Sequence, residues 1–297
     1  MMKVFVVGNI ALDQTLAVDR MPLEGESIFG SKISTDLGGK GTNQAIVLAR
    51  CGIPTILIAA IGTDAQSRQM RDRLSQEPVI ARLIERADIS GDTTIVLKDA
   101  DGGNVNITTV DCARSLGIED VRPLMGDAEP GDLLVLQGNL TVAATADIMH
   151  EARAKRLRLA LNPSPLVPNI VPHLKGLDVI FLNEHEAEEI TGLRKQAAVQ
   201  YLLDLEIDVV VLTLGASGAL LGNKDGIAAV PAQQTDVADS TGAGDTFQSV
   251  AIGSALRRRT WIDNLSLSKA AMAAAITVSR FGTAAAFPSK VELEELL

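Results

Sequence analysis

Continuous apolar runs alternate with amphipathic segments along most of this 297-residue chain. The apolar runs predict strands that are buried on both faces, at residues 3–7, 55–60, 132–137, 158–161, 178–182 and 208–214. The segments between them predict helices at residues 42–51, 141–154, 184–191 and 195–205, and a small-residue helix at 270–278. Strands that alternate with helices in this way are typical of a largely parallel sheet with helices on both faces. The pattern therefore predicts an α/β fold.

Two segments break this rhythm and predict a small β-sheet outside the main one. Residues 13–37 and 93–110 alternate polar and apolar positions, with turn signals such as Asp101-Gly102-Gly103. We expect them to form antiparallel strands of a lid over an active site. No internal repeat, low-complexity tract or linker is evident, so we expect a single domain over residues 1–297.

The composition argues against several classes of function. The net charge is −10, which disfavours a nucleic-acid surface and binding to an anionic membrane. No segment reaches the ~18 uninterrupted apolar residues of a spanning helix, and the first apolar run is too short for a signal peptide. The two cysteines, Cys51 and Cys112, and the three histidines have no disulfide or zinc-site spacing. We therefore expect a cytoplasmic protein without a nucleic-acid or membrane partner.

The most informative motif is Asp239-Ser-Thr-Gly-Ala-Gly-Asp-Thr-Phe247, in which two carboxylates flank a turn of small residues. The turn leads into a helix-like segment, whose first N–H groups and dipole form an anion site. Asp245 lies in the first turn, beside that site. A carboxylate and a bound anion repel each other, so folding alone explains the position of Asp245 poorly. The position is explained well if Asp245 is a base that deprotonates a hydroxyl for attack on a phosphoryl group. The alternative is a helix-capping turn, in which the dipole favours Asp245.

A second glycine-rich motif, Gly38-Gly-Lys-Gly-Thr-Asn-Gln-Ala45, also enters a predicted helix. It lacks both the Walker A spacing and the G-x-G-x-x-G fingerprint, so a dinucleotide-dependent oxidoreductase is excluded. Bare backbone beside the cation of Lys40 and the amide of Asn43 suits a polyhydroxyl ligand. A glycine-rich turn that caps the helix is the structural alternative.

Four carboxylates crowd the start of the helix predicted from Leu182-Asn-Glu-His-Glu-Ala-Glu-Glu-Ile-Thr-Gly192. Mg²⁺ prefers few carboxylates together with water and phosphate oxygens. Glu186 is therefore a candidate to organise Mg²⁺, with Asn183 at the strand end. The alternative is a solvated acidic face that complements the helix dipole.

The last motif, Leu212-Thr-Leu-Gly-Ala-Ser-Gly218, follows a strongly apolar strand. Its glycines allow a flat ligand or phosphates to approach the backbone closely. A plain hairpin turn is the alternative.

In this order, the four motifs resemble the ribokinase-like (PfkB) family of carbohydrate and nucleoside kinases, and the resemblance spans essentially the whole chain. The early Gly8-Asn-Ile-Ala-Leu-Asp13 and the later Asn162-Pro-Ser-Pro165 also resemble that family. The resemblance implies the ribokinase-like α/β fold and ATP-dependent phosphorylation of a sugar hydroxyl.

The resemblance also implies roles for individual residues. Asp245 is expected to be the catalytic base, with an anion hole formed by the N–H groups of Gly242, Ala243 and Gly244. The residues expected to hold the sugar are Asp13, Gly39, Lys40 and Asn43. Those expected to contact ATP are Asn183, Thr213, Gly215 and Gly218, with Glu186 in the magnesium region. A monovalent cation, usually potassium, is expected beside Asp239, Thr241 and the backbone of Thr277, Arg280 and Gly282.

The chain departs from the family members that phosphorylate ribose. Ala11 stands where they carry an asparagine towards the sugar, and Asn139 stands where a glutamate would contact ribose, which makes Asn139 a further substrate-binding candidate. Arg114 replaces an asparagine after the lid strands, and Ala286 takes a position that is often serine near the potassium site. A pocket without a partner for a buried hydroxyl discriminates strongly, so the acceptor sugar stays open.

These features together predict a kinase that uses ATP and Mg²⁺ to phosphorylate the hydroxymethyl group of a small sugar. A nucleoside kinase of the same fold is the first alternative, but it must stack a base and aromatic residues form only 3% of the chain. A phosphosugar kinase needs extra cations, for which Lys32 and Arg114 are candidates. A non-catalytic sugar or nucleotide sensor is the alternative of another class, against which an intact Asp245 argues. The exposed lid edge favours a homodimer through the lid.

Overall fold

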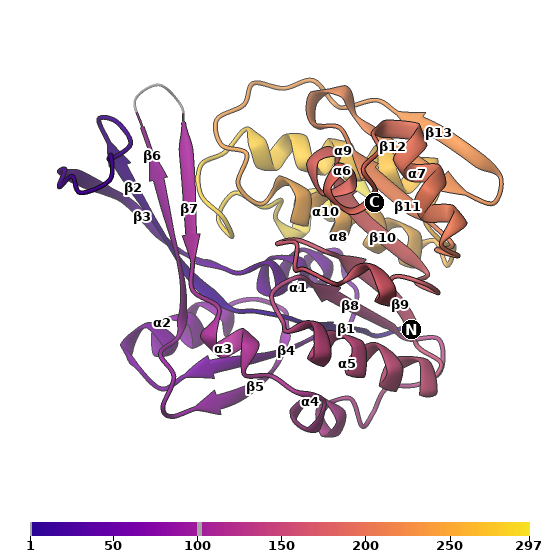
Figure 1. The fold of residues 1–297 in the computed structure, drawn as a ribbon, viewed down its shortest axis with the longest axis horizontal. Coiled ribbons are helices and arrows are strands. Elements are labelled where there is room, and N and C mark those ends of the chain that lie inside the picture. The colour runs from indigo at the N-terminus through magenta and orange to yellow at the C-terminus, as the bar shows by residue number, and fades with distance from the viewer. Residues whose placement is uncertain (1, 100–102) are drawn as a thin grey trace.

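A nine-stranded sheet forms the centre of the structure, a computed structural model that describes residues 2–99 and 103–297 (Figure 1). The strand order is β13-β12-β11-β10-β9-β8-β1-β4-β5. The strands are β1 Val4–Val7, β4 Thr55–Gly62, β5 Ile80–Arg86, β8 Leu133–Gln137, β9 Arg158–Asn162, β10 Val179–Asn183, β11 Val210–Thr213, β12 Ala219–Asn223 and β13 Gly226–Val230. Neighbours from β5 to β11 pair in parallel, and only β11–β12 and β12–β13 are antiparallel. The predicted α/β fold with a largely parallel sheet is confirmed.

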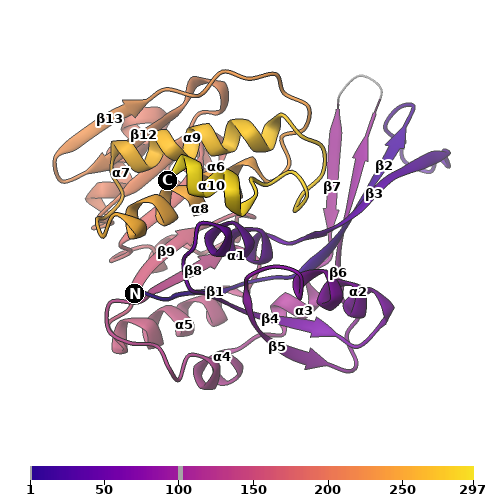
Figure 2. The same ribbon diagram turned by 180° about the vertical axis from the view of Figure 1, so that it is seen from behind.

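Helices cover both faces of this sheet because alternate strand residues point to opposite sides (Figures 1 and 2). Val4 and Val6 belong to one buried cluster, and Phe5 and Val7 belong to the other. The helices that contribute buried side chains to the first cluster are α1 Lys40–Arg50, α2 Ala65–Leu74, α8 Ala243–Arg257, α9 Asn264–Val278 and α10 Lys290–Leu296. The helices that contribute buried side chains to the second cluster are α3 Asp111–Arg114, α4 Ile118–Leu124, α5 Val142–Ala154, α6 Glu184–Thr191 and α7 Lys195–Asp204. Within residues 2–99 and 103–297, no helix combines the length and apolar character that crossing a membrane requires.

Several elements are absent from the pattern-based prediction. Strand β5 lies at the edge of the sheet with only half-buried or exposed residues, so its sequence contains no continuous apolar run. Helix α2 buries only Ser67, Met70 and Leu74, which is too few for a clear helical period. Strands β12 and β13 are short and rich in glycine and alanine, residues with little preference for strands.

A second, four-stranded sheet forms the lid, with the order β3-β2-β6-β7. Its strands are β2 Ala11–Val18, β3 Gly30–Gly38, β6 Asp92–Lys98 and β7 Asn104–Thr108. Each predicted lid segment forms an antiparallel hairpin, and the two hairpins join through the parallel pair β2–β6. Figure 1 shows this sheet projecting from one end of the body. The turn signal at Asp101 and Gly102 lies outside the described residues.

The carboxyl ends of the parallel strands gather polar side chains at one edge of the main sheet. Asn9 follows β1, Asn139 follows β8, and Asn183 ends β10. Ligands of open α/β sheets bind at this edge, and the lid leaves the body here, since β2 starts at Ala11 directly after β1.

Candidate active site

The anion-hole motif forms a tight turn at the start of α8. Gly242 caps the helix with a positive φ of 75°, and an added Cβ at Gly242 would lie 2.5 Å from Cε1 of Phe287, so only glycine fits there. The N–H of Ala243 donates to the carbonyl of Ser240 at 3.3 Å. Within the described chain, the N–H groups of Gly242 and Gly244 donate to no protein acceptor, and they are free to bind an anion.

Asp245 lies in the first turn of α8 and is only 6% exposed. Its Oδ2 accepts a hydrogen bond from Asn43 Nδ2, and its Oδ1 accepts one from Gln44 Nε2, both at 2.9 Å. Gln44 is held in turn, because its Oε1 accepts from Gln137 Nε2 at 2.7 Å and from Gln248 Nε2 at 3.3 Å. This chain of amides fixes the orientation of the Asp245 carboxylate.

Asp13 on β2 forms the second buried carboxylate of the site, at 6% exposed. Burial raises the pKa of Asp13 to about 6, against hydrogen bonds from Thr283 and Thr94, and the charges of Asp36 and Asp245 raise it further. Oδ2 of Asp13 accepts from Thr283 Oγ1 at 2.9 Å.

The glycines of the second motif make room for Asp13 and start α1. A Cβ at Gly38 would lie 2.1 Å from the carboxylate carbon of Asp13. Gly39 has a φ of 90° and precedes Lys40, the half-buried first residue of α1. A Cβ at Gly39 would lie 2.9 Å from the carbonyl oxygen of Asn9, so glycine is required there by the close packing of the two backbone segments.

Several buried side-chain oxygens around these groups lack a hydrogen-bond donor among the described residues. They are Asp13 Oδ1, Asn43 Oδ1, Gln137 Oε1 and Asn139 Oδ1. Buried acceptors without donors are uncommon and destabilising. A ligand with several hydroxyl groups supplies such donors, so this cluster, which we call the acceptor site, suits a polyhydroxyl compound.

On the other side of the α8 turn lies a pocket of about 340 Å³, which we call the nucleotide pocket. Thr213, Gly215 and Gly218 line it together with Ala243 and Gly244. Further lining comes from Ala216, residues 232–235, Val237, Ser240 and Phe247, and from Ala271, Ala274, Ala275 and Val278 of α9. Apart from Gln233, Gln234 and the hydroxyl side chains, this lining is small or apolar, which suits a flat apolar ring, and Gly244 is part of the pocket wall.

Gly218 shows why the fourth motif needs glycine. Its φ is 92°, and a Cβ there would lie 2.1 Å from the carbonyl oxygen of Val230. The segment from Thr213 to Ala219 joins the antiparallel strands β11 and β12. It is therefore a hairpin connection and also a wall of the nucleotide pocket.

Asn183 and Glu186 form a capping box at the start of α6. Asn183 Oδ1 accepts from the Glu186 N–H at 2.8 Å, and Glu186 Oε2 accepts from the Asn183 N–H at 2.9 Å. This arrangement accounts for both residues as a helix start. Among the described residues, no group of three or more His, Cys, Asp or Glu side chains is arranged to hold a metal ion, and the magnesium role of Glu186 stays a prediction.

Asp239, the predicted cation ligand, is 8% exposed. Its Oδ1 accepts from the N–H and the Oγ1 of Thr241 at 3.0 and 2.8 Å. Its Oδ2 accepts from Lys98 Nζ at 2.7 Å and from the Gly282 N–H at 3.4 Å. The Lys98 ammonium group, from lid strand β6, therefore lies on the carboxylate that was expected to bind a metal cation.

Comparison with known proteins agrees with this geometry. The family model described as "pfkB family carbohydrate kinase" matches residues 1–290. The chain belongs to this family of carbohydrate kinases.

Named relatives and solved structures cover the whole length of this carbohydrate kinase. It is 28% identical to mouse ribokinase over 304 residues, which cover 98% of this chain and 93% of the mouse protein. The ribokinase structure from Thermotoga maritima superposes with a TM-score of 0.88 at 23% identity, and covers 100% of this chain and 99% of that one. The Arabidopsis thaliana ribokinase structure, solved with ribose and ATP, has a TM-score of 0.85 at 23% identity, with 99% and 98% covered. At these identities the two structures establish the fold.

The fold of this carbohydrate kinase brings most of the predicted site residues into two adjoining groups. Asp13, Asn43 and Asp245 meet in the acceptor site, while Ala243 and Gly244 line the nucleotide pocket. Asn183 and Glu186 are not among the residues that line that pocket. The sequence analysis missed several residues that contact the site, namely Gln44, Gln137, Gln248, Thr283 and Lys98. Gln44 follows Asn43 inside the motif and could have been found there, but no sequence signal pairs the other four with their partners.

Proposed function

We propose that this carbohydrate kinase transfers the γ-phosphoryl group of ATP to the hydroxymethyl group of a small sugar. The observation that carries the proposal is the position of Asp245 between two sites. Its carboxylate is bound by Asn43 of the acceptor site, while the residues before it, Ala243 and Gly244, line the nucleotide pocket. A hydroxyl held in the first site can therefore face a phosphoryl group held in the second.

On the acceptor side, the unpaired oxygens of Asp13, Asn43 and Asn139 accept hydrogen bonds from sugar hydroxyls. Asp245 takes the proton of the attacking hydroxyl as general base. Because Asn43 and Gln44 hold both carboxylate oxygens at 2.9 Å, the base is oriented before the sugar arrives, which lowers the reorganisation that the reaction requires.

On the nucleotide side, the N–H groups of Gly242 and Gly244 bind the charge that develops on the transferred phosphoryl group. The positive end of the α8 dipole adds to this effect. Mg²⁺ bound with the nucleotide neutralises phosphate charge. Glu186 is the residue that we propose for holding it through water, since the capping box engages only its Oε2. The lid excludes water from the reacting groups.

Ribose is the first sugar to test, because the relatives above are ribokinases. The acceptor site differs from theirs at Ala11 and Asn139, where an amide and a carboxylate are expected in ribose-specific members. Both positions are buried, so the loss of an amide at Ala11 and the exchange of a carboxylate for the amide of Asn139 change which sugar fits.

The decisive experiment measures ADP release with ribose, 2-deoxyribose, hexoses, sugar phosphates and nucleosides. We expect one small neutral sugar to be preferred. Asp245→Asn keeps the volume of the side chain but removes the base, and we expect kcat on the best sugar to fall by roughly 10²–10⁴-fold. Binding of a non-hydrolysable ATP analogue should stay within about threefold, since general-base loss leaves ground-state binding intact. Near-normal turnover of this variant contradicts the assignment of the base, and the absence of ADP release above background with every acceptor contradicts the kinase proposal.

We further propose that the protein is cytoplasmic and forms a homodimer through the lid. The two cysteines, Cys51 and Cys112, are buried and free. On the lid, Ile95 faces Ile107 across the β6–β7 pair, and both side chains are exposed, by 37% and 55%. An apolar face of this kind on a small sheet favours pairing with a second copy, which sedimentation at micromolar concentration tests.

A further inference from the structure

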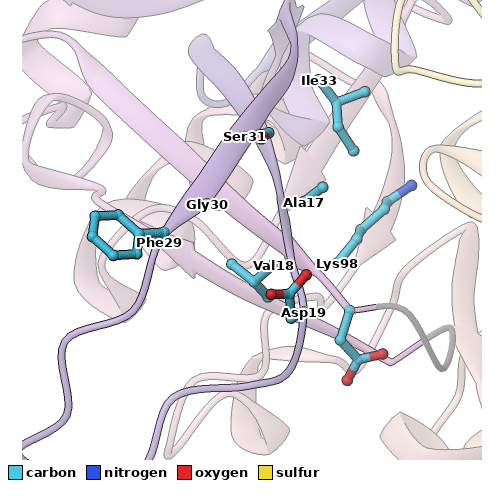
Figure 3. Close-up of a pocket in the computed structure, with 9 residues that line it drawn as sticks. Ala17, Val18, Asp19, Phe29, Gly30, Ser31, Ile33 and Lys98 are labelled. Carbon is cyan, nitrogen blue, oxygen red and sulfur yellow. The ribbon is translucent and has the colours of Figure 1, made fainter.

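Lys98 reaches the body of the protein from the inner face of the lid. Side chains of a strand alternate between faces, so Thr94, Val96 and Lys98 share one face of β6. Thr94 contacts Asp13 of the acceptor site and Val96 is buried. Lys98 is the last residue of the strand. Figure 3 shows its side chain in the hollow at the tip of the lid, a cavity of about 430 Å³, beside Ala17 and Ile33.

The Lys98–Asp239 contact is not a surface ion pair. The Asp239 side chain is 6% exposed and the Lys98 side chain is 23% exposed, with 2.7 Å between Nζ and Oδ2. Burial raises the pKa of Asp239, but the hydrogen bonds from Lys98 and Thr241 outweigh it and hold that pKa below its usual range. Exposed pairs contribute little to stability, whereas an isolated buried charge is strongly unfavourable.

Asp239 holds the turn that leads to the anion hole. Its Oδ1 binds the N–H and the hydroxyl of Thr241, and the next residue, Gly242, caps α8. The direction of the Gly242 and Gly244 N–H groups therefore depends on Asp239. A cation at Asp239 compensates its buried charge and fixes the turn.

The monovalent cation expected at this place does not fit the residues as they stand. Oδ2 of Asp239 is engaged by the Lys98 ammonium group at 2.7 Å. A second cation on the same carboxylate would also be repelled by Lys98.

We propose that Lys98 is the resident cation of the Asp239 site, a positioning residue that makes the kinase independent of added monovalent cations. The inference rests on the proposed function, because the aim of the anion-hole N–H groups matters only for phosphoryl transfer. Since β6 belongs to the lid, the cation of the Asp239 site is supplied by the lid sheet, which links the lid to the turn that carries the anion hole.

The first experiment compares kcat in potassium, sodium and tetramethylammonium chloride at equal ionic strength. We expect wild-type kcat to agree within about twofold in the three salts, because Lys98 supplies the charge. Lys98→Met leaves Asp239 buried without a counter-charge, and we expect kcat to fall by roughly tenfold or more in tetramethylammonium. Potassium should restore most of that loss, with the KM of the sugar changed less than kcat. Lys98→Arg should retain activity in all three salts.

Lys224→Met is the matched control, because Lys224 is exposed on the turn between β12 and β13 and loses the same charge far from Asp239. It should respond to salt as the wild type does. A wild type that is active only with potassium overturns the inference, and so does a Lys98→Met variant whose salt response equals that of the wild type.

A second readout needs no turnover. The melting temperature of Lys98→Met should rise more in potassium than in tetramethylammonium chloride, while that of the wild type should not distinguish them. When Asp239→Asn is added to Lys98→Met, the difference between the two salts should disappear, since no carboxylate then attracts the ion. If no acceptor is phosphorylated, the proposed function fails, and these melting curves still decide whether Lys98 occupies a cation site. Equal salt responses of wild type and Lys98→Met in melting overturn the inference by themselves.

Discussion

The acceptor site and the nucleotide pocket, on the two sides of the α8 turn, are lined by different kinds of residue. The acceptor site consists of buried polar side chains, such as Asp13, Asn43 and Asn139, some of whose oxygens have no donor. The nucleotide pocket is lined by small and apolar residues, with glycines at Gly215, Gly218 and Gly244. Both sides meet at one turn of helix.

This difference implies different rules for specificity. A buried oxygen without a donor rejects any ligand that lacks a hydroxyl at that point, so side-chain identity selects the sugar. A wall of mostly small and apolar residues recognises shape, so the lack of a side chain at Gly215, Gly218 and Gly244 is what matters on the nucleotide side. Substitutions in the acceptor site should therefore change different kinetic parameters from substitutions in the nucleotide pocket.

The largest effect in this comparison is expected for Gly244→Ala. A Cβ at Gly244 meets nothing within 4 Å, and alanine favours helix by about 1 kcal/mol, so the folded protein should be no less stable. The methyl group would stand at the wall of the nucleotide pocket, beside the N–H that binds the phosphoryl group. The backbone N–H remains in this variant, but a methyl group that keeps the phosphoryl group away from it should cost about as much as losing one such donor, roughly 10²–10³-fold in kcat, which steady-state assays with the best sugar can measure.

Gly242→Ala provides the contrast for this prediction. Its Cβ would lie 2.5 Å from the Phe287 ring at a φ of 75°, so this variant should lose both melting temperature and activity. If Gly244→Ala instead melts much earlier than the wild type, its lost activity reports folding, and the assignment of a free N–H at the pocket wall is wrong.

The sequence was sufficient for the buried parallel strands of the main sheet and for the order of the four motifs. Buried parallel strands are continuous apolar runs, and the glycine-rich turns that precede α1 and α8, at Gly38 and Gly242, have recognisable spacing. It was insufficient for half-buried elements such as β5 and α2, whose patterns merge with those of loops. Capping accounts for Glu186, one of the four carboxylates of α6, only once its contacts with Asn183 are known.

Contacts between distant segments could not be predicted either. Gln44 and Gln137 meet because α1 packs against β8 near the carboxyl ends of the parallel strands. Lys98 meets Asp239 because the lid folds over the body. One chain without aligned relatives carries no signal for such pairs. The polar network of the acceptor site therefore emerges only from the fold.

Asp13 allows the acceptor site to be tested by pH. Its pKa of about 6 means that the carboxylate becomes protonated as the pH falls below 6, and a protonated oxygen accepts fewer hydroxyl hydrogen bonds. We expect kcat/KM for the sugar to fall below pH 6. Asp13→Asn should lower kcat/KM by roughly 10–150-fold at pH 7.5, because a hydrogen bond to a charged group contributes about 1.5–3 kcal/mol, and should remove the step near pH 6.

The free energy of unfolding should depend on the protonation of Asp13 in the opposite direction to kcat/KM. The pKa of Asp13 in the folded protein, about 6, lies above its ordinary value of 3.8, so the folded state binds the proton more tightly. The free energy of unfolding should fall as the pH rises from about 4 to 6, by about 3 kcal/mol for such a shift. Asp13→Asn should flatten that slope in urea titrations. An unchanged slope means that Asp13 does not titrate in this range.

The smallest effect is expected for Asn139→Ala, which removes a buried Oδ1 that has no donor among the described residues. The net contribution of one neutral hydrogen bond is about 0.5–1.5 kcal/mol, so the KM of the preferred sugar should rise by roughly 2–12-fold with kcat nearly unchanged. Melting temperature should not fall, because the free protein loses an unsatisfied acceptor rather than a bond. Asn223→Ala, at the far end of β12, controls for the loss of an amide elsewhere. If KM for every sugar stays at the wild-type value, Asn139 does not contact the acceptor, and sugar selection on this side rests on Asp13 and Asn43 alone.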